Sequence, residues 1–427
     1  MTRPKLVVIG NGMAAGRAME ELFARAPGRY DVTVFGAEPR VNYNRIMLSP
    51  VLSGEATYEQ ILIHDEAWYE RHGVTLHRGV EIVAIDRAAK TVTARDGQVT
   101  PYDTLLIATG SSPFVPPILG STLPGVRAYR DLDDVLAMHE AARRGGRAVV
   151  IGGGLLGLEA AAGLAMRGMA TTVVHLMPTL MERQLDPEAG AMLQTAIEAR
   201  GITVRCYAST TAILGEDHVT GVRFADGDEI PADIVVMAVG IRPNVALARM
   251  AGLDIKRGVV VDDGLQTSDP DILAVGECVE HRGQCYGLVA PLYDMARVVA
   301  ARLAGEADAI YEGSVTATKL KVTGISLFSA GDFAAGEDRE EIVLRDPEHN
   351  QYRRLVLRDG QLVGAVLYGD TDDGAWFFDL VQKRAEVAPL RDSLIFGEGF
   401  ADPQALAAVL AAQRSPALAD AAVRKVA

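Results

Sequence analysis

A continuous run of apolar residues near the start of the chain is followed by a glycine-rich turn, and the same pattern returns once further along. The two runs are Lys5–Ile9 and Arg147–Ile151, and an alanine-rich segment follows each turn. A short, uniformly apolar run is typical of a strand that is buried on both faces of a parallel sheet, and the longer segment after it predicts a helix. The pattern therefore predicts two α/β units, each built on a doubly wound parallel sheet.

Further apolar runs predict the other strands of the two units: Asp31–Phe35 and Pro101–Gly110 in the first, and Thr171–Val174 and Ala232–Gly240 in the second. A later run at Asp269–Glu277, followed by a helical segment at about Pro291–Ala304, comes after the second unit has ended. We expect this run to return to the sheet of the first unit. The order along the chain therefore indicates that the second unit is inserted into the first.

Both glycine turns carry the dinucleotide-binding fingerprint, in which small residues recur between a buried strand and a helix. They are Gly10, Gly12 and Ala15 in the first turn, and Gly152, Gly154 and Gly157 in the second. In this motif backbone N–H groups and the positive end of the helix hold a pyrophosphate where side chains would block its approach. One copy is weak evidence, but two copies in the same strand-turn-helix context predict two dinucleotide cofactors.

From about Tyr311 the pattern changes to short alternating segments, which are typical of an antiparallel sheet. We therefore expect an α/β protein in which two Rossmann-like dinucleotide-binding domains precede a C-terminal α+β domain. In that last domain we expect Trp376–Phe378 to pack in the core. We expect the pairs Arg143–Arg144, in the second unit, and Arg353–Arg354, in the last domain, to lie on solvated faces. The expected boundaries are 1–118 with 242–310, 119–241, 311–403, and 404–427 for a tail.

The position after the second strand of such a unit recognises the adenosine ribose. Glu38 follows the strand Asp31–Phe35, where a carboxylate can accept hydrogen bonds from both ribose hydroxyls. His175 holds the same position in the second unit. A histidine does not repel the extra phosphate of NADP, and Arg183 is close enough in sequence to assist it, so the choice between NADH and NADPH stays open. The alternative is that Glu38 is only a loop acid and His175 only a strand-end residue.

Composition and charge exclude several classes of protein. The 427 residues are 49% hydrophobic, which is enough for several buried cores, and the formal net charge is −14. Because nucleic-acid binding depends on clustered Lys and Arg, this charge argues against a nucleic-acid partner. No apolar run reaches the roughly 18–20 residues that span a bilayer, and the N-terminus has no signal-peptide core. We therefore expect a cytoplasmic protein that binds neither nucleic acid nor membrane.

The three cysteines, Cys206, Cys278 and Cys285, are too few and too scattered for a disulfide scaffold, and no two of them form a C-x-x-C pair. An iron–sulfur cluster needs about four closely spaced thiolates. We therefore expect no metal site and no chemistry that depends on a pair of reactive thiols.

Together these features resemble the flavoprotein family with two dinucleotide-binding domains that includes the ferredoxin and rubredoxin reductases. The resemblance covers about residues 4–400 and is nearest to the flavin module at the N-terminal end of the large subunit of NAD(P)H-dependent nitrite reductase. Four stretches carry it: Asn42–Pro50, Val174–Asp186, Val275–Gly283 and Gly369–Trp376. The resemblance implies that the first unit binds FAD and that the second binds NADH or NADPH, with NADH favoured.

The resemblance also implies roles for single residues. Glu159, on the helix after the second fingerprint, would reach the nicotinamide carboxamide beside the flavin and is the expected catalytic residue. Arg45 would contact the pyrophosphate or the flavin edge, and Arg130 the flavin nucleotide. For Glu159 and Arg130 the alternative is an ordinary surface charge. The remaining residues expected at the cofactors are Ile82, Thr109, Gly110, Gly240, Gly276 and Glu277, the last two as a second clamp on FAD.

The function implied by the resemblance is the transfer of a hydride from NADH to FAD and of electrons onward to a redox partner. That partner would be a protein or domain of the ferredoxin, rubredoxin or nitrite and nitrate reductase kind, in nitrite or nitrate assimilation. The large subunit of nitrite reductase continues into a cysteine-rich iron–sulfur module and sirohaem domains, and this sequence ends before them, so it either serves a separate protein or is part of a longer enzyme. Alternatives are a ferredoxin or rubredoxin reductase of another pathway, an NADH oxidase and a flavin-based redox sensor. The oligomeric state stays open.

Overall fold

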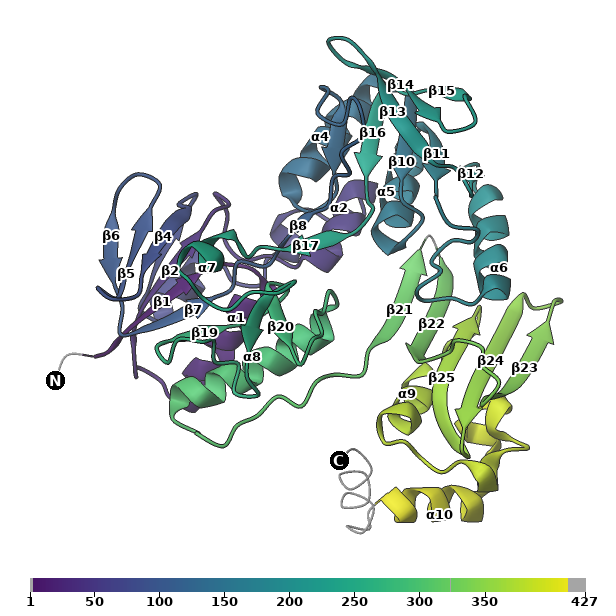
Figure 1. The fold of residues 1–427 in the computed structure, drawn as a ribbon. Coiled ribbons are helices and arrows are strands. Elements are labelled where there is room, and N and C mark those ends of the chain that lie inside the picture. The colour runs from purple at the N-terminus through teal and green to yellow at the C-terminus, as the bar shows by residue number, and fades with distance from the viewer. Residues whose placement is uncertain (1–2, 323, 414–427) are drawn as a thin grey trace.

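The computed structural model describes residues 3–322 and 324–413, and its first unit is built around a parallel sheet (Figure 1). The strand order is β19-β7-β1-β2-β3. The strands are β1 (Lys5–Ile9), β2 (Asp31–Gly36), β3 (Val74–Arg78), β7 (Thr104–Ile107) and β19 (Ile272–Ala274). Strand β19 pairs in parallel with β7, with Ile272 opposite Leu105, although the second unit lies between them in sequence. The chain therefore leaves this sheet, builds the second unit and returns.

Two long helices, α1 (Met13–Arg25) and α8 (Val289–Ala304), pack against each other beside the first sheet. The small buried residues Ala15 and Ala18 let α1 lie close to its neighbours, and Met19 and Leu22 fill the core. The short helices of this unit are η1 (Arg45–Met47), α2 (Leu48–Ser53), η2 (Glu59–Ile61), α3 (Glu66–Arg71) and α7 (Ala246–Met250). Its minor strands are β4 (Ile82–Asp86), β5 (Thr91–Ala94), β6 (Val99–Pro101), β18 (Val259–Val261) and β20 (Val279–His281).

The second unit repeats the parallel scheme, with strand order β12-β11-β10-β16-β9. The strands are β9 (Val126–Ala128), β10 (Arg147–Ile151), β11 (Ala170–Val174), β12 (Thr203–Arg205) and β16 (Ile234–Met237). Helix α5 (Leu155–Met166) is apolar nearly all round because it lies between this sheet and α2 of the first unit. The other elements are α4 (Leu132–Arg144), α6 (Pro187–Glu198), β13 (Thr210–Gly215), β14 (Val219–Phe224) and β15 (Glu229–Pro231).

The two chain segments that cross between the units lie side by side. Strand β8 (Ser111–Pro113) leaves the first unit, and β17 (Ile241–Pro243) returns to it. They pair antiparallel, with Ile241 opposite Pro113, and the Phe114 N–H donates to the carbonyl of Gly240 at 2.8 Å. The second unit is therefore attached through one two-stranded connection, visible between the two sheets in Figure 1.

The C-terminal sheet is antiparallel, with strand order β21-β22-β25-β24-β23, and lies beside the second unit (Figure 1). Helix α9 (Gly374–Gln382) covers one face, where Phe377 is fully buried as expected. On the other side, the Tyr352 hydroxyl donates to Asp186 at 2.5 Å, and that of Tyr368 to the carbonyl of Met192 at 3.3 Å. The strands are β21 (Ala317–Val322), β22 (Ile325–Gly331), β23 (Glu340–Asp346), β24 (Gln351–Arg358) and β25 (Gln361–Tyr368), and the short helices are η3 (Ala388–Leu390), η4 (Leu394–Phe396) and η5 (Glu398–Phe400).

The expectation that Arg353 and Arg354 lie on a solvated face is wrong, since each is only 6% exposed. Strand β24 lies inside the sheet, so successive side chains point to opposite faces that are both covered. Arg353 donates to Asp373 at 2.8 Å and to Asp370 at 2.6 Å, and Arg354 donates twice to Glu341. A charged pair in a sequence gives no sign of such distant carboxylates. The pair Arg143–Arg144 is exposed, as expected.

Helix α10 (Pro403–Gln413) is the last element of the described chain. The rest of the expected tail, residues 414–427, lies outside the described residues. Among the residues that the structure describes, no helix is long and apolar enough to cross a membrane.

Candidate functional site

In the first fingerprint, the fold itself requires one glycine but not the next. Gly10 has φ +108°, and a Cβ there would lie 2.1 Å from the carbonyl oxygen of Ala108, so the turn needs a glycine. Gly12 has φ −85°, which any residue adopts, and a Cβ there would meet nothing within 4 Å. Ala15, on the first turn of α1, is fully buried. Neither backbone nor packing explains Gly12, which leaves open space beside the start of α1.

The second fingerprint repeats this division. Gly152 has φ +126°, and a Cβ there would lie 2.3 Å from the carbonyl oxygen of Ala238. Gly154 has φ −84° and would meet nothing within 4 Å. At Gly157 a Cβ would lie 1.9 Å from the carbonyl oxygen of Gly152, so this glycine brings α5 against the turn. The open middle glycine is the residue that a pyrophosphate must approach closely.

The helices after the two fingerprints have no side-chain cap. Helices α3, α4 and α6 each begin with an aspartate that accepts a backbone N–H, at Asp65, Asp131 and Asp186. Helices α1 and α5 begin at glycines without such a bond, and neither has an acidic residue in its first turn. Their first N–H groups and positive dipole ends are therefore available to an anion.

Glu38, two residues after β2, has two partners. The Tyr43 hydroxyl donates to its carboxylate at 2.7 Å, and Arg45 forms an ion pair with the other oxygen. Arg45 also donates to the carbonyl of Arg130 at 2.9 Å. The structure therefore brings together three residues that the sequence expected at FAD, and adds Tyr43, which sequence reasoning missed. Tyr43 lies in the stretch Asn42–Pro50, which carries the family resemblance, and this position could have marked it as a site residue.

Arg130 and Glu277 join the two units. Arg130 follows β9 in the second unit and pairs with Glu277, which follows β19 in the first, while the Ser111 hydroxyl donates to the same carboxylate at 2.7 Å. In the described part of the chain, the buried Nε of Arg130 and Nδ2 of Asn11 have no hydrogen-bond partner. Buried donors without acceptors are costly. One such donor in the first fingerprint and one in this ion pair fit a nucleotide with acceptor oxygens, such as FAD.

The other residues expected at the cofactors divide into two groups. Gly110 and Gly240 have positive φ and open space where a Cβ would lie, and the Thr109 hydroxyl donates to the carbonyl of Asn244 at 2.9 Å. At Gly276, φ is +96° and a Cβ would lie 3.1 Å from Ala14 on α1. Ile82, by contrast, begins β4 and belongs to the hydrophobic core of the first unit at 7% exposure.

Glu159 lies on α5 in a polar cluster between the units. The Ser49 hydroxyl, on α2, donates to its carboxylate at 2.6 Å, and Ser49 Oγ lies 2.9 Å from the Tyr129 hydroxyl. Burial raises the pKa of the Glu159 carboxyl, and the weaker opposing effect is the Ser49 hydrogen bond. Ser49 and Tyr129 escaped sequence reasoning because the contacts join three distant segments. The cluster can hold a proton or donate and accept hydrogen bonds toward a ligand between the units.

His175 is not an isolated strand-end residue. Its Nδ1 accepts the Gly153 N–H at 3.1 Å, and its Nε2 lies 3.0 Å from Glu182. Sequence reasoning missed Glu182, since nothing in the order of residues shows that the loop after β11 folds back. Arg183, considered above as an aid to NADP, is exposed and makes no ion pair within the described residues.

The three cysteines lie apart and none forms a disulfide. Burial raises the pKa of each thiol, so all three stay protonated near neutral pH. Among the described residues no group of three or more His, Cys, Asp and Glu side chains could hold a metal ion.

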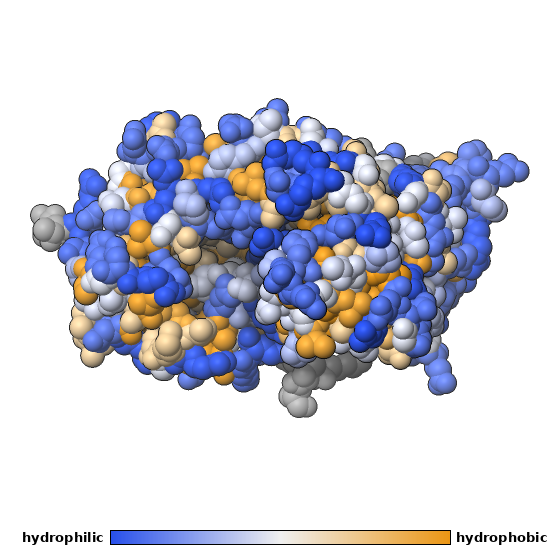
Figure 2. Space-filling model, turned by 90° about the horizontal axis from the view of Figure 1, so that it is seen from above, coloured by the Kyte–Doolittle hydropathy of each residue, from blue (hydrophilic) through white to orange (hydrophobic). Residues whose placement is uncertain are grey.

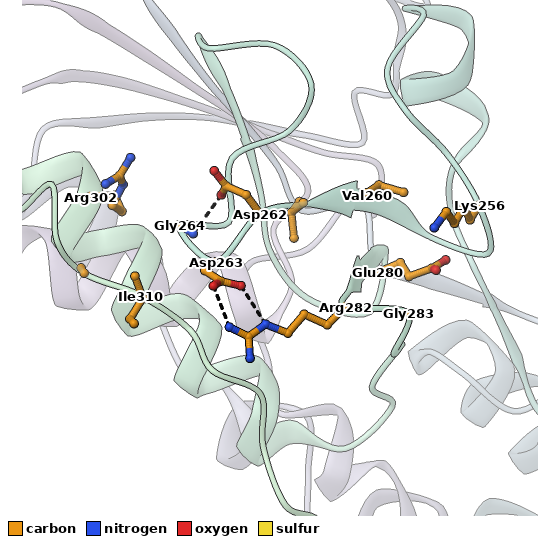
Figure 3. A pocket seen from close by; sticks show the side chains of 12 residues that line it. Lys256, Val260, Asp262, Asp263, Gly264, Glu280, Arg282, Gly283, Arg302 and Ile310 are labelled. Atoms are coloured by element: carbon orange, nitrogen blue, oxygen red, sulfur yellow. Dashed lines mark hydrogen bonds and ion pairs between the residues drawn. The ribbon is translucent and has the colours of Figure 1, made fainter. Parts of the chain in front are cut away.

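A cavity of about 700 Å³ lies away from both fingerprints, beside β18, β20 and the end of α8 (Figure 3). Two of its charged groups pair with each other, since Arg282 donates to Asp263 at 2.9 and 2.7 Å. It contains none of the residues expected at the cofactors. Figure 2 shows a face on which hydrophobic and hydrophilic residues mix and which is hollowed near its middle. We therefore assign the functional site to the fingerprints and not to this cavity.

Comparisons with known proteins agree with this geometry. Residues 4–302 match the pyridine nucleotide-disulphide oxidoreductase family model, and residues 317–385 match the rubredoxin NAD+ reductase C-terminal domain. The chain is 48% identical to a nitrite reductase [NAD(P)H] of Bacillus subtilis (strain 168), covering 91% of this chain and 48% of that protein. It is 39% identical to the assimilatory nitrate reductase electron transfer subunit of the same strain, covering 92% and 51%. The chain thus spans about half the length of these curated relatives.

Among solved structures, the covalent putidaredoxin reductase–putidaredoxin complex matches with a TM-score of 0.85 and 25% identity, over 96% of this chain and all of that one. The NADH:rubredoxin oxidoreductase of Clostridium acetobutylicum matches with a TM-score of 0.77 and 25% identity, over 91% and 97%. The fold class and the family expected from the sequence are confirmed. The chain belongs to the pyridine nucleotide-disulphide oxidoreductase family of NAD(P)H-dependent flavoproteins.

Proposed function

We propose that this chain takes a hydride from NADH onto FAD and passes the electrons to a separate redox protein or domain in nitrite or nitrate assimilation. The observation that carries the proposal is the pair of open glycines, Gly12 and Gly154, each at the uncapped start of a helix. Two pyrophosphate sites in adjoining units fit one resident flavin nucleotide and one nicotinamide nucleotide. When bound, FAD supplies the hydride-accepting and electron-releasing chemistry.

The chain's own groups bind and orient the two nucleotides. In the first unit, the α1 N-terminus holds the flavin pyrophosphate, Glu38 the ribose, and Arg130 donates its unpartnered Nε. In the second unit, the α5 N-terminus holds the nicotinamide nucleotide. Glu159 lies on the second turn of α5, and its carboxyl accepts from Ser49, whose Oγ also lies next to the Tyr129 hydroxyl. We assign it to the nicotinamide carboxamide.

The electron acceptor is proposed from the relatives and from charge. One relative is named an electron transfer subunit of nitrate reductase, and another, 31% identical over 77% of this chain, a nitric oxide reductase FlRd-NAD(+) reductase of Vibrio vulnificus (strain CMCP6). The net charge of −14 suits an acceptor with basic patches, and such an encounter weakens as salt rises.

Anaerobic titration of the FAD-loaded chain with NADH tests the proposal. We expect bleaching of the flavin band and steady turnover with ferricyanide. Absence of bleaching by both NADH and NADPH would overturn the proposal. Bleaching without turnover would favour a redox sensor, and fast consumption of oxygen an NADH oxidase.

A second assay addresses nitrite itself. The three cysteines do not cluster, so the chain has no site for an iron–sulfur centre within the described residues. We expect no nitrite consumption with NADH as sole donor. Nitrite loss by the purified chain would contradict transfer to a separate protein or domain.

A further inference from the structure

We propose that Glu182, held by His175, makes this chain select NADH over NADPH. The inference rests on the proposed function, because it concerns the electron donor of that reaction. It also revises the interpretation of His175, which on sequence alone leaves the choice of donor open.

The loop after β11 folds back onto the glycine turn. The Met181 N–H donates to the carbonyl of Gly153 at 3.0 Å, and the Leu180 side chain is fully buried. A Cβ at Gly153 would lie 2.7 Å from both Leu180 and the His175 ring, so the two side chains close over this glycine. Glu182 follows directly after Met181 and is therefore brought to the carboxyl end of β11.

The hydrogen bonds determine which atom of His175 carries the proton. The Gly153 N–H donates to Nδ1, so Nδ1 has its lone pair free and carries no hydrogen. Nε2 therefore carries the hydrogen and donates to Glu182 at 3.0 Å. A ring in this form is neutral, and the carboxylate keeps its negative charge. The pair presents one net negative charge beside the second fingerprint.

This charge lies near the expected position of the adenosine ribose, which is where NADH and NADPH differ. In a dinucleotide-binding unit the adenosine ribose lies at the end of the second strand, and a carboxylate there accepts from the 2′-hydroxyl of NADH. NADPH carries a phosphate at that hydroxyl, which a carboxylate repels. Here the position after the strand belongs to His175, and the carboxylate comes from seven residues further along. Glu182 is 29% exposed, so solvent screens the repulsion only in part.

The competing candidate is Arg183, whose cation would favour the phosphate of NADPH. It is exposed, whereas Glu182 is held by a hydrogen bond to the His175 side chain, which is only 10% exposed. A side chain that is already held in place loses less conformational entropy on contacting a ligand than one without such a contact. The geometry therefore favours Glu182.

The experiment compares Glu182→Gln with Glu198→Gln, which removes the same charge from the far end of α6. Binding of ADP-ribose and of 2′-phospho-ADP-ribose is measured by calorimetry, and kcat/KM for NADH and NADPH by flavin reduction. We expect the NADH:NADPH ratio of Glu182→Gln to fall at least about tenfold, which corresponds to ~1.4 kcal/mol, in both assays. Glu198→Gln should leave the ratio unchanged.

A double variant that moves the carboxylate from position 182 to position 175 separates loss of the charge from misfolding. In His175→Glu combined with Glu182→Ala, the carboxylate stands directly after β11, and the NADH preference should remain. An unchanged ratio in Glu182→Gln, or a loss of NADPH use in Arg183→Gln, would overturn the inference. Because these outcomes need reduction by at least one donor, they differ from failure of the proposed function, in which neither NADH nor NADPH bleaches the flavin.

Discussion

The two glycine turns have the same backbone conformation, but the carboxylate that we assign to the ribose is supplied differently in each. In both, a first glycine with positive φ fits under a carbonyl and a middle glycine leaves open space. Glu38 lies two residues after β2 and is held by Tyr43 and Arg45, whereas Glu182 of the second unit comes from a loop that folds back to His175. The glycines of each turn are thus local in sequence, whereas the carboxylate that we assign to the ribose of the second unit comes from further along the chain.

The largest effect should come from filling the open space at each turn. Gly12→Val should fold, since its φ and surroundings accept a side chain, but its FAD affinity should fall roughly a thousandfold, or ~4 kcal/mol. Gly154→Val should keep FAD and lose NADH to a similar degree. Flavin content and NADH titration measure the two losses. Equal loss of flavin in both variants would contradict the separation of the sites.

Substitutions at the third position of the fingerprint should change the free energy of unfolding differently in the two units. Gly157→Ala forces a Cβ to 1.9 Å from the Gly152 carbonyl oxygen, and we expect a loss of about 3 kcal/mol in the free energy of unfolding. Ala15→Gly, the reverse change in the first unit, should cost only about 1 kcal/mol, the helix propensity of glycine. Urea unfolding compares the two. A cost for Gly157→Ala no larger than that for Ala15→Gly would show that α5 moves away easily.

Glu159 has no counterpart in the first unit, where Arg17 stands two residues beyond Ala15. Glu159→Ala should slow flavin reduction by NADH roughly tenfold to a hundredfold through poorer positioning, while FAD stays bound. Stopped-flow bleaching measures the rate. Ser49→Ala, which removes only the hydroxyl donor, should have a smaller effect in the same direction. An unchanged rate in Glu159→Ala would mean that this residue is an ordinary charged side chain with no role in flavin reduction.

The smallest effect concerns pH and stability. Because burial raises the pKa of Glu159 in the folded chain, ionising it opposes folding, so Glu159→Gln should raise the melting temperature at pH 8. We expect about 2 °C. The difference should disappear as the pH falls below the ordinary carboxyl pKa of about 4.3, where the glutamate is protonated in both states. A difference that grows on acidification would contradict this assignment.

The elements that depend on short-range pattern could be predicted from the sequence. The strands that flank both fingerprints and the return of β19 to the first sheet followed from apolar runs. Arg353 and Arg354 could not be placed, because their partners Asp370, Asp373 and Glu341 come from other segments. The same reason hid Glu182 and the Ser49–Glu159 contact. The roles of the site residues themselves stay predictions.

The paired strands β8 and β17 have a consequence for how such a chain can arise and change. Since Pro113 and Ile241 face each other across a two-stranded ribbon, the departure and return points of the second unit nearly coincide. A gene segment encoding the residues between them can be gained, exchanged or removed without changing the strand order of the first sheet. Domain insertions are tolerated best where the two ends of the inserted segment lie close together at a surface. The connectivity of the chain thus allows the second unit, to which we assign the electron donor, to be exchanged while the strand order of the first sheet is kept, although Arg130 and Glu159 still contact residues of the first unit.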